Sequence, residues 1–162
     1  MKKKIILTSL LSAALIATLF LFWGSGDPRM KNFPELKKDY ERIVKVVWEY
    51  HTDMDNKEEF VTIYIVDGDQ GIYSVKCDEQ DIILTDEERE SLANICTQSY
   101  SKYNYIWVSS EYVIFWEDEM KKYGILYANK PEDAIKDIKT WYEDLEYHKL
   151  DKCWYEIGYF GL

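Results

Sequence analysis

Apolar residues recur every three to four positions in three stretches of the chain, as they do along a helix with one buried side. A proline suited to a first helical turn opens the first and third stretches, which predict helices over residues 34–50 and 131–147. In the second stretch, Thr85 and Glu88 have the spacing of a capping box. They predict a helix from about residue 85 to 96.

Alternating and continuously apolar runs predict strands between and after these helices. Residues 60–77 (FVTIYIVDGDQGIYSVKC) are typical of a β-hairpin. Residues 104–109, 112–117 and 123–128 form a three-strand meander, and residues 153–160 (CWYEIGYF) form a last strand. Strands joined by short loops are antiparallel. We therefore expect an α+β fold, with about three helices packed on an antiparallel sheet.

The meander, YIWVSSEYVIFWEDEMKKYGILYA, is apolar on both faces, whereas a strand with one wet face alternates. Sorted by parity, one face collects mostly aliphatic and small residues, namely Ile106, Val108, Val113, Phe115, Gly124, Leu126 and Ala128. The other face is mostly aromatic and contains the candidate binding residues Tyr105, Trp107, Tyr112, Trp116, Tyr123 and Tyr127. The first face is expected to be core.

Three interpretations of the aromatic face remain open. A helix of the chain itself covers it, either the helix at 34–50 or the C-terminal one. Alternatively, it is a protein-interaction surface, because tyrosine and tryptophan dominate binding hot spots. In the third interpretation it stacks on a cell-wall glycan or another small ligand. Left uncovered, the face would exceed the apolar area that a monomer usually exposes.

The N-terminus predicts a membrane segment. Lys2, Lys3 and Lys4 precede an uncharged run that begins at Ile5 and ends at Trp23. As a helix this run would span about 28 Å, close to the thickness of a bilayer core.

The lysines favour a cytoplasmic N-terminus, with the domain outside the membrane, and are typical of a bacterial export signal. The alternative is a signal peptide cleaved near Gly26. The expected organisation is a signal anchor or signal peptide at 1–23, a linker at 24–31 and one extracytoplasmic domain at 32–162.

The charge of the chain favours a cationic partner. The net charge of the whole chain is −10. Three of its 20 Lys and Arg residues are Lys2, Lys3 and Lys4. The rest of the chain therefore contains 17 Lys and Arg residues and all 30 Asp and Glu residues, a net charge of −13. A nucleic-acid partner would require a basic face, so we expect none. Acidity also keeps an exported domain soluble, which is the simpler interpretation.

Chemical motifs are scarce. Cys77, Cys96 and Cys153 would allow one disulfide in an oxidising compartment, and all three pairings stay open; burial as small apolar residues is the default. No metal-ligand spacing and no cofactor motif occurs, so we expect neither group. His51 and His148 each follow a predicted helix, where a cation complements the helix dipole.

The sequence thus favours a non-enzymatic, membrane-tethered or exported acidic interaction domain. Its expected partner is a cationic protein, in an immunity-like or inhibitor-like role. A module for envelope glycan or a small ligand is the alternative. A hydrolase using Glu117 or Asp118 is a third hypothesis, since paired carboxylates support glycosidic acid–base chemistry.

Overall fold

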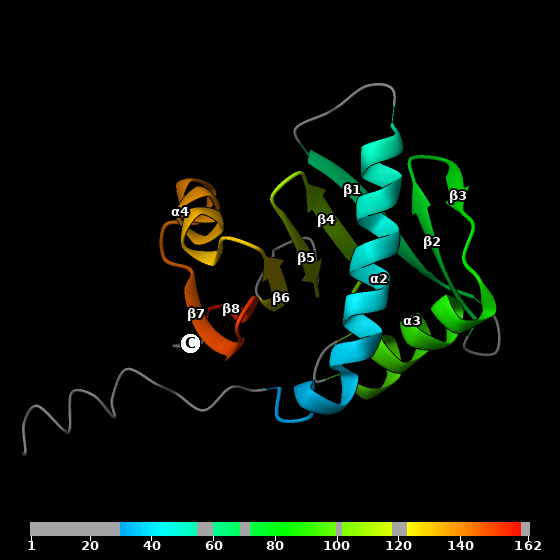
Figure 1. Ribbon diagram of the computed structural model, residues 1–162, viewed down its shortest axis with the longest axis horizontal. Helices are drawn as coiled ribbons and strands as arrows, with labels where there is room; N and C mark the ends of the chain where they lie inside the picture. The colour runs from blue at the N-terminus through cyan, green and yellow to red at the C-terminus, as the bar shows by residue number, and fades with distance from the viewer. Residues whose placement is uncertain (1–29, 55–59, 69–71, 100–101, 118–122, 160–162) are drawn as a thin grey trace, which may run out of the picture.

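The computed structural model describes residues 30–54, 60–68, 72–99, 102–117 and 123–159. They form three helices and eight strands in an α+β arrangement (Figure 1). The helices are α2 (Phe33–Asp53), α3 (Asp86–Gln98) and α4 (Pro131–Trp141). The strands are β1 (Phe60–Asp67), β2 (Tyr73–Cys77), β3 (Gln80–Ile82), β4 (Tyr105–Ser109), β5 (Tyr112–Trp116), β6 (Tyr123–Ala128), β7 (Glu146–Asp151) and β8 (Trp154–Gly158).

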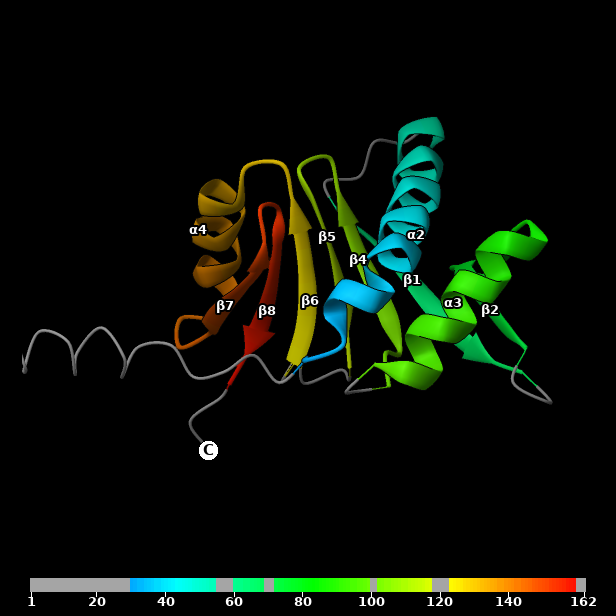
Figure 2. The ribbon, with the colours of Figure 1, turned by 60° about the horizontal axis from the view of Figure 1, so that its bottom comes forward.

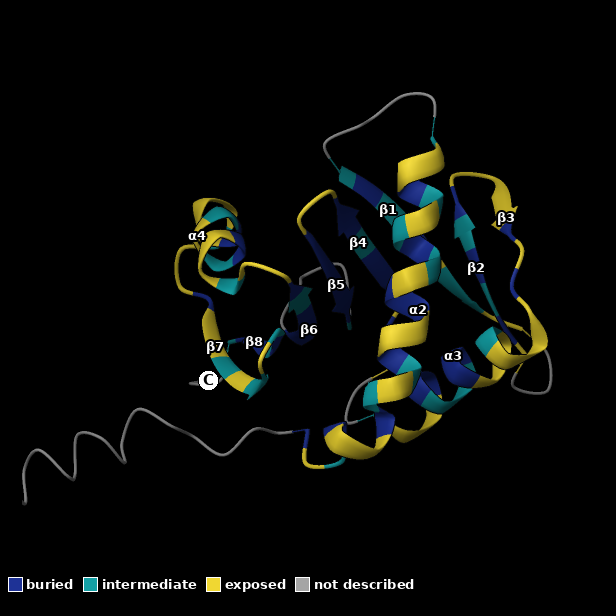
Figure 3. Ribbon diagram, viewed as in Figure 1, coloured by how far each residue is buried: buried dark blue, intermediate teal, exposed yellow. Residues whose placement is uncertain are grey.

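All eight strands belong to one antiparallel sheet in the order β3-β2-β1-β4-β5-β6-β8-β7. The first hairpin joins the meander through β1 and β4, which pair over Phe60↔Ser109 to Tyr64↔Tyr105. The last hairpin joins it through β8, which pairs with β6. The central strands β4, β5 and β6 are therefore hydrogen-bonded on both sides, and most of their residues are buried (Figure 3).

The helices cover opposite faces of different halves of the sheet (Figures 1 and 2). Helix α2 lies over β4 and α3 over β2 on one face, which we call the α2 face. Helix α4 lies over β6 on the other, the α4 face. Two separate hydrophobic clusters result, one on each side of the sheet.

Aromatic rings hold α2 on its face. Tyr40, fully buried, has its ring centroid 5.0 Å from that of Phe115 and 5.7 Å from that of Trp154, both nearly edge-on. Its hydroxyl donates to the Tyr103 hydroxyl at 3.0 Å. Burial of aromatic rings in such tilted pairs stabilises a layer contact beyond the area that it removes from water.

Most predicted elements are confirmed, with ends shifted by a few residues. The capping box of α3 forms: Thr85 Oγ1 accepts from the Glu88 amide at 3.3 Å, and the Glu88 carboxylate accepts from the Thr85 amide at 2.7 Å. Prolines stand in the first turns of α2 and α4, as expected. The turn proposed for the first hairpin, at residues 67–71, falls partly outside the described residues.

Two strands were not predicted. Strand β3 follows a two-residue turn at Asp78, which takes a left-handed φ of 54°, a conformation that Asp tolerates better than most residues. Strand β7 replaces the last turn of the helix expected at 131–147, because α4 ends at Trp141. His148 therefore lies in a strand, not after a helix, and His51 lies within the last turn of α2, where it is buried.

The predicted membrane segment, Ile5 to Trp23, lies outside the described residues. Among the helices that the structure describes, none is both long and apolar enough to cross a membrane. The described chain begins at Met30, whose backbone amide donates to Glu156 Oε1 at 3.0 Å. The hydroxyl of Tyr123 donates to the same buried oxygen at 2.6 Å. The Glu156 carboxylate thus ties Met30 and the start of β6 to β8.

The three cysteines are free thiols in this structure. Cys77 and Cys96 are buried in the α2-face core, as expected for small apolar residues. Cys153 lies nearer the surface, between β7 and β8.

Candidate functional site

The aromatic face predicted in the meander is covered by the chain's own helix α4. Ala134 and Ile138 of that helix pack into one cluster with four of the strand residues, namely Tyr105, Tyr112, Ile114 and Trp116. Trp116 is fully buried, and Trp107 beside it is half-buried, with the two rings edge-on at 6.1 Å. These aromatics therefore build a core layer, the first of the three interpretations.

Tyr123 and Tyr127 lie on the α2 face, opposite the other four candidate residues. The expected parity of β6 is reversed, because Phe115 pairs with Ile125 and Trp116 pairs with Gly124. Directly paired residues share a face, so Gly124 is on the α4 face and Tyr123 is buried on the α2 face. A shift of one residue exchanges the two faces of a strand. The apolar pattern within each strand does not reveal the register between strands, so the prediction assigned β6 to the wrong faces.

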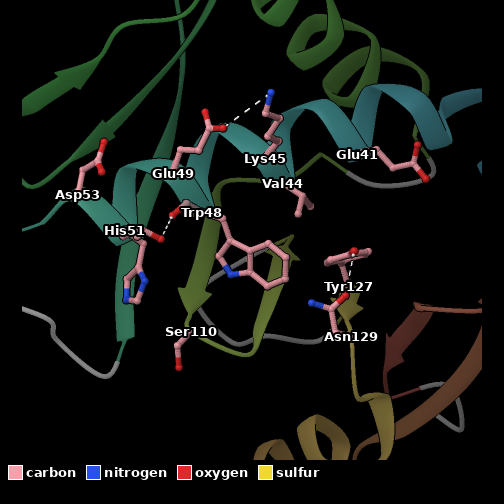
Figure 4. A pocket seen from close by; sticks show the side chains of 11 residues that line it. Glu41, Val44, Lys45, Trp48, Glu49, His51, Asp53, Ser110, Tyr127 and Asn129 are labelled. Atoms are coloured by element: carbon pink, nitrogen blue, oxygen red, sulfur yellow. Dashed lines mark hydrogen bonds and ion pairs between the residues drawn. The ribbon is translucent and has the colours of Figure 1, made fainter.

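Tyr127 lines a groove of about 790 Å³ beside the C-terminal half of α2 (Figure 4). One wall is α2, and the other comes from the end of β6 and the turn between β4 and β5. The lining residues are Glu41, Val44, Lys45, Trp48, Glu49, His51, Thr52, Asp53, Ser110, Tyr127 and Asn129.

Two aromatic rings meet edge-to-face in this groove, and we call them the Trp48–Tyr127 corner. Their centroids are 5.3 Å apart, with planes at 74°. The Trp48 indole Nε1 donates to the backbone oxygen of Ser109 at 2.7 Å, which sets the orientation of the ring. The Tyr127 ring packs against the buried Trp154 ring, with centroids 4.7 Å apart. The hydrogen bond to Ser109 and the contact with Trp154 thus orient the two rings, and each ring keeps part of its surface exposed.

The groove is acidic. Its lining contains the carboxylates of Glu41, Glu49 and Asp53 and one ammonium group, that of Lys45, which lies 3.7 Å from Glu49. Glu41 also contacts Lys37 at 3.6 Å, one helical turn away. Burial raises the pKa of the Tyr127 hydroxyl, and the nearby Cys153 and Glu41 raise it further. With three carboxylates and one ammonium group, the lining carries a net negative charge.

The structure places only some of the residues considered for metal binding and hydrolysis. In the described part of the chain, the His, Cys, Asp and Glu side chains form no group that could hold a metal ion. Glu117, one of the two carboxylates considered for hydrolysis, directly follows β5, and its backbone amide donates to the Tyr123 backbone oxygen at 3.0 Å. Its neighbour Asp118 lies outside the described residues.

Sequence reasoning missed Trp48 and the acids of α2. One signal was present: Trp48 lies next to the apolar stripe that ends in Val44 and Val47, among the charged positions Lys45 and Glu49. A large aromatic at the polar border of a helix often has an apolar body and a wet tip.

Comparison of the chain with models of known protein families, with curated proteins and with solved structures finds no match.

Proposed function

We propose that this protein is a membrane-tethered interaction domain that binds a cationic segment of a partner protein in the groove between α2 and β6. The single observation that carries the proposal is the combination of acidic lining and exposed aromatic area in one concave site. Carboxylates attract and orient a cationic partner, and rigid aromatic rings supply contact area at low entropic cost. Neutralising a cationic toxin or hydrolase would be a fitting role.

The tether and the groove lie toward opposite ends of α2. Residues 1–29 join the domain at Met30, just before the helix begins. The groove is lined by the part of α2 from Glu41 to Asp53. A helix of 21 residues is about 30 Å long. The groove therefore lies toward the end of α2 that is remote from Met30, the first described residue after the predicted membrane segment.

A glycan or other neutral ligand is the second candidate. The groove volume of about 790 Å³ is within the range of small-molecule sites. Hydroxyl and amide groups of Thr52, Ser110 and Asn129 lie beside the two rings. Rings with polar neighbours suit a sugar, whose binding would depend little on salt.

Binding of a short peptide of alternating lysine and serine to the full-length chain, in a sugar-free non-ionic detergent, tests the proposal. We expect binding that weakens as salt rises, because exposed charges are screened. The groove variant Glu41→Gln/Asp53→Asn should bind roughly three- to tenfold less tightly at low salt. Glu79→Gln/Glu90→Gln removes the same charge from exposed sites on other elements and is the matched control.

Equal weakening in both variants would mean that only the overall charge matters, and would count against the groove. Binding of cell-wall oligosaccharide that is insensitive to salt, and is lost in Trp48→Leu, would favour the second candidate. For a natural partner, capture from secreted fractions counts only where the groove variant loses a protein that the control variant retains.

A further inference from the structure

We infer that the Trp48–Tyr127 corner recognises the guanidinium group of an arginine side chain, stacked on the aromatic rings and facing the carboxylate of Glu41. This rests on the proposed function and adds the residue that the groove selects. Nothing in the charge of the lining alone distinguishes arginine from lysine. The shape of the corner does.

The corner consists of two half-buried rings whose planes meet at 74°, with centroids 5.3 Å apart. A cation within about 6 Å of a ring is attracted by the negative face of that ring. A guanidinium is planar and weakly hydrated, so it can lie flat on one ring while its edge meets the other. An ammonium is compact and strongly hydrated, and gains less from flat aromatic surfaces.

The corner is formed before any ligand arrives. The hydrogen bond from the Trp48 indole to Ser109 fixes one ring, and contact with Trp154 fixes the other. Trp154 packs in turn on Tyr40 in the α2-face core. A ligand therefore does not have to order these side chains, which lowers the entropic cost of binding.

The groove also supplies an acceptor suited to the guanidinium. Glu41 lines the same groove as the two rings, and its half-exposed carboxylate lies 3.6 Å from the Lys37 ammonium, a surface ion pair that is weak in water. Arginine binds carboxylates through two parallel N–H donors, a geometry that an ammonium cannot reproduce. The groove, at about 790 Å³, also has space for residues that flank the arginine.

The test uses N-acetyl-arginine methylamide, its lysine counterpart and its citrulline counterpart, which is neutral but close to arginine in shape. Each is titrated into the full-length chain in the same detergent while the indole N–H resonances are followed by NMR. The Trp48→Phe variant identifies the Trp48 signal. We expect the arginine compound to shift that signal, the lysine compound to bind less tightly, and the citrulline compound to leave it unmoved.

Tyr127→Leu and Trp48→Leu should weaken binding of the arginine compound by roughly two- to thirtyfold, the range of a cation–π contact. Trp48→Leu lacks the reporting indole, so binding to both variants is measured by isothermal titration calorimetry. The matched control is Trp141→Leu, which removes a more exposed aromatic from α4 and should change nothing. A cooperative melting transition well above the temperature of the titration would show that each variant stays folded.

Equal shifts from arginine and citrulline, or unchanged binding in both corner variants, would overturn the inference. The proposed function would survive that result if the lysine–serine peptide still bound with salt sensitivity and still depended on Glu41 and Asp53. If that peptide also failed to bind, both proposals would fall.

Discussion

Two sets of aromatic residues, one on each face of the sheet, are built for different purposes. Trp116 and Tyr112 lie under α4, almost wholly buried, and contact only protein over nearly all their surface. Trp48 of α2 and Tyr127 of β6 line the groove. A hydrogen bond to Ser109 orients the Trp48 ring, contact with Trp154 orients the Tyr127 ring, and both rings are half-buried. Residue type is the same in both sets, so the difference in role comes from what covers the rings.

The largest effect is expected from Trp116→Ala, which removes a fully buried ring. Such truncations cost about 3–5 kcal/mol of unfolding free energy, because packing is lost and a cavity remains. Urea unfolding would measure the loss. Trp116→Phe should cost far less, since the Trp116 Nε1 has no hydrogen-bond partner among the described residues. An unchanged urea midpoint for Trp116→Ala would contradict the assignment of this layer to the core.

Gly124→Ala is expected to destabilise the same layer. A Cβ at this position would lie 2.7 Å from the Phe115 backbone oxygen and 2.8 Å from Cε3 of Trp116. Both neighbours are held by packing, and overpacking typically costs about 1–3 kcal/mol. A lower melting temperature, with near-ultraviolet circular dichroism reporting a displaced Trp116, would confirm the close approach. An unchanged melting temperature would contradict the close approach of β6 to Trp116.

Trp48→Ala should cost less stability than Trp116→Ala and more binding. The indole of Trp48 is only half-buried, and its hydrogen bond to Ser109 is expected to contribute about 1 kcal/mol. Measured side by side in urea, the two variants should differ by at least about 1 kcal/mol. Equal losses would remove the contrast between a core ring and a groove ring.

Stability should fall as the pH rises above 9, partly through Cys96. Burial raises the pKa of this thiol from 9.0 to about 12. Because the thiol ionises more readily in the unfolded chain, the unfolded state loses its proton first and is favoured as pH rises. The expected loss is about 1 kcal/mol between pH 9 and 10. Cys96→Val should show a shallower decline in urea midpoint over that interval, and an identical decline would refute this contribution.

The smallest effect is expected from Tyr127→Phe. It removes only an exposed hydrogen bond, from the Tyr127 hydroxyl to Asn129 Oδ1 at 3.3 Å, and keeps the ring against Trp154. We expect a change in unfolding free energy within about 0.5 kcal/mol. Binding of the arginine compound should also persist in this variant, which separates the ring of Tyr127 from its hydroxyl. Loss of binding would transfer the role from the ring to the hydroxyl.

Much of the fold was predictable because its signals are local. The capping box at Thr85, the apolar spacing of α2 and the strands of the meander all follow from neighbouring residues. Strand β7 was not predictable in this way. Its sequence, EYHKLD, is mostly polar, and it becomes a strand by pairing with β8 at the edge of the sheet. Edge strands commonly carry charges that discourage further pairing.

The candidate site was predicted only in part. Of the six aromatic candidates, Tyr127 alone lines the groove. Most other members of the site lie on α2, far away in sequence, and nothing local connects Trp48 with Tyr127. Trp107 and Trp116 looked equally suited to binding in the sequence, yet both pack in the cluster on the α4 face, where Trp116 is fully buried and Trp107 half-buried.

The sequence by itself determined the α+β class, most of the helices and strands, and the acidic balance of the chain, because periodicity, capping and composition are properties of nearby residues. Only the tertiary structure decided which aromatic rings are core and which are exposed. Whether a ring is shielded from water depends on the segment that packs against it, which is often remote in sequence. For Trp116 that segment is α4, and for Trp48 the outer side has none among the described residues.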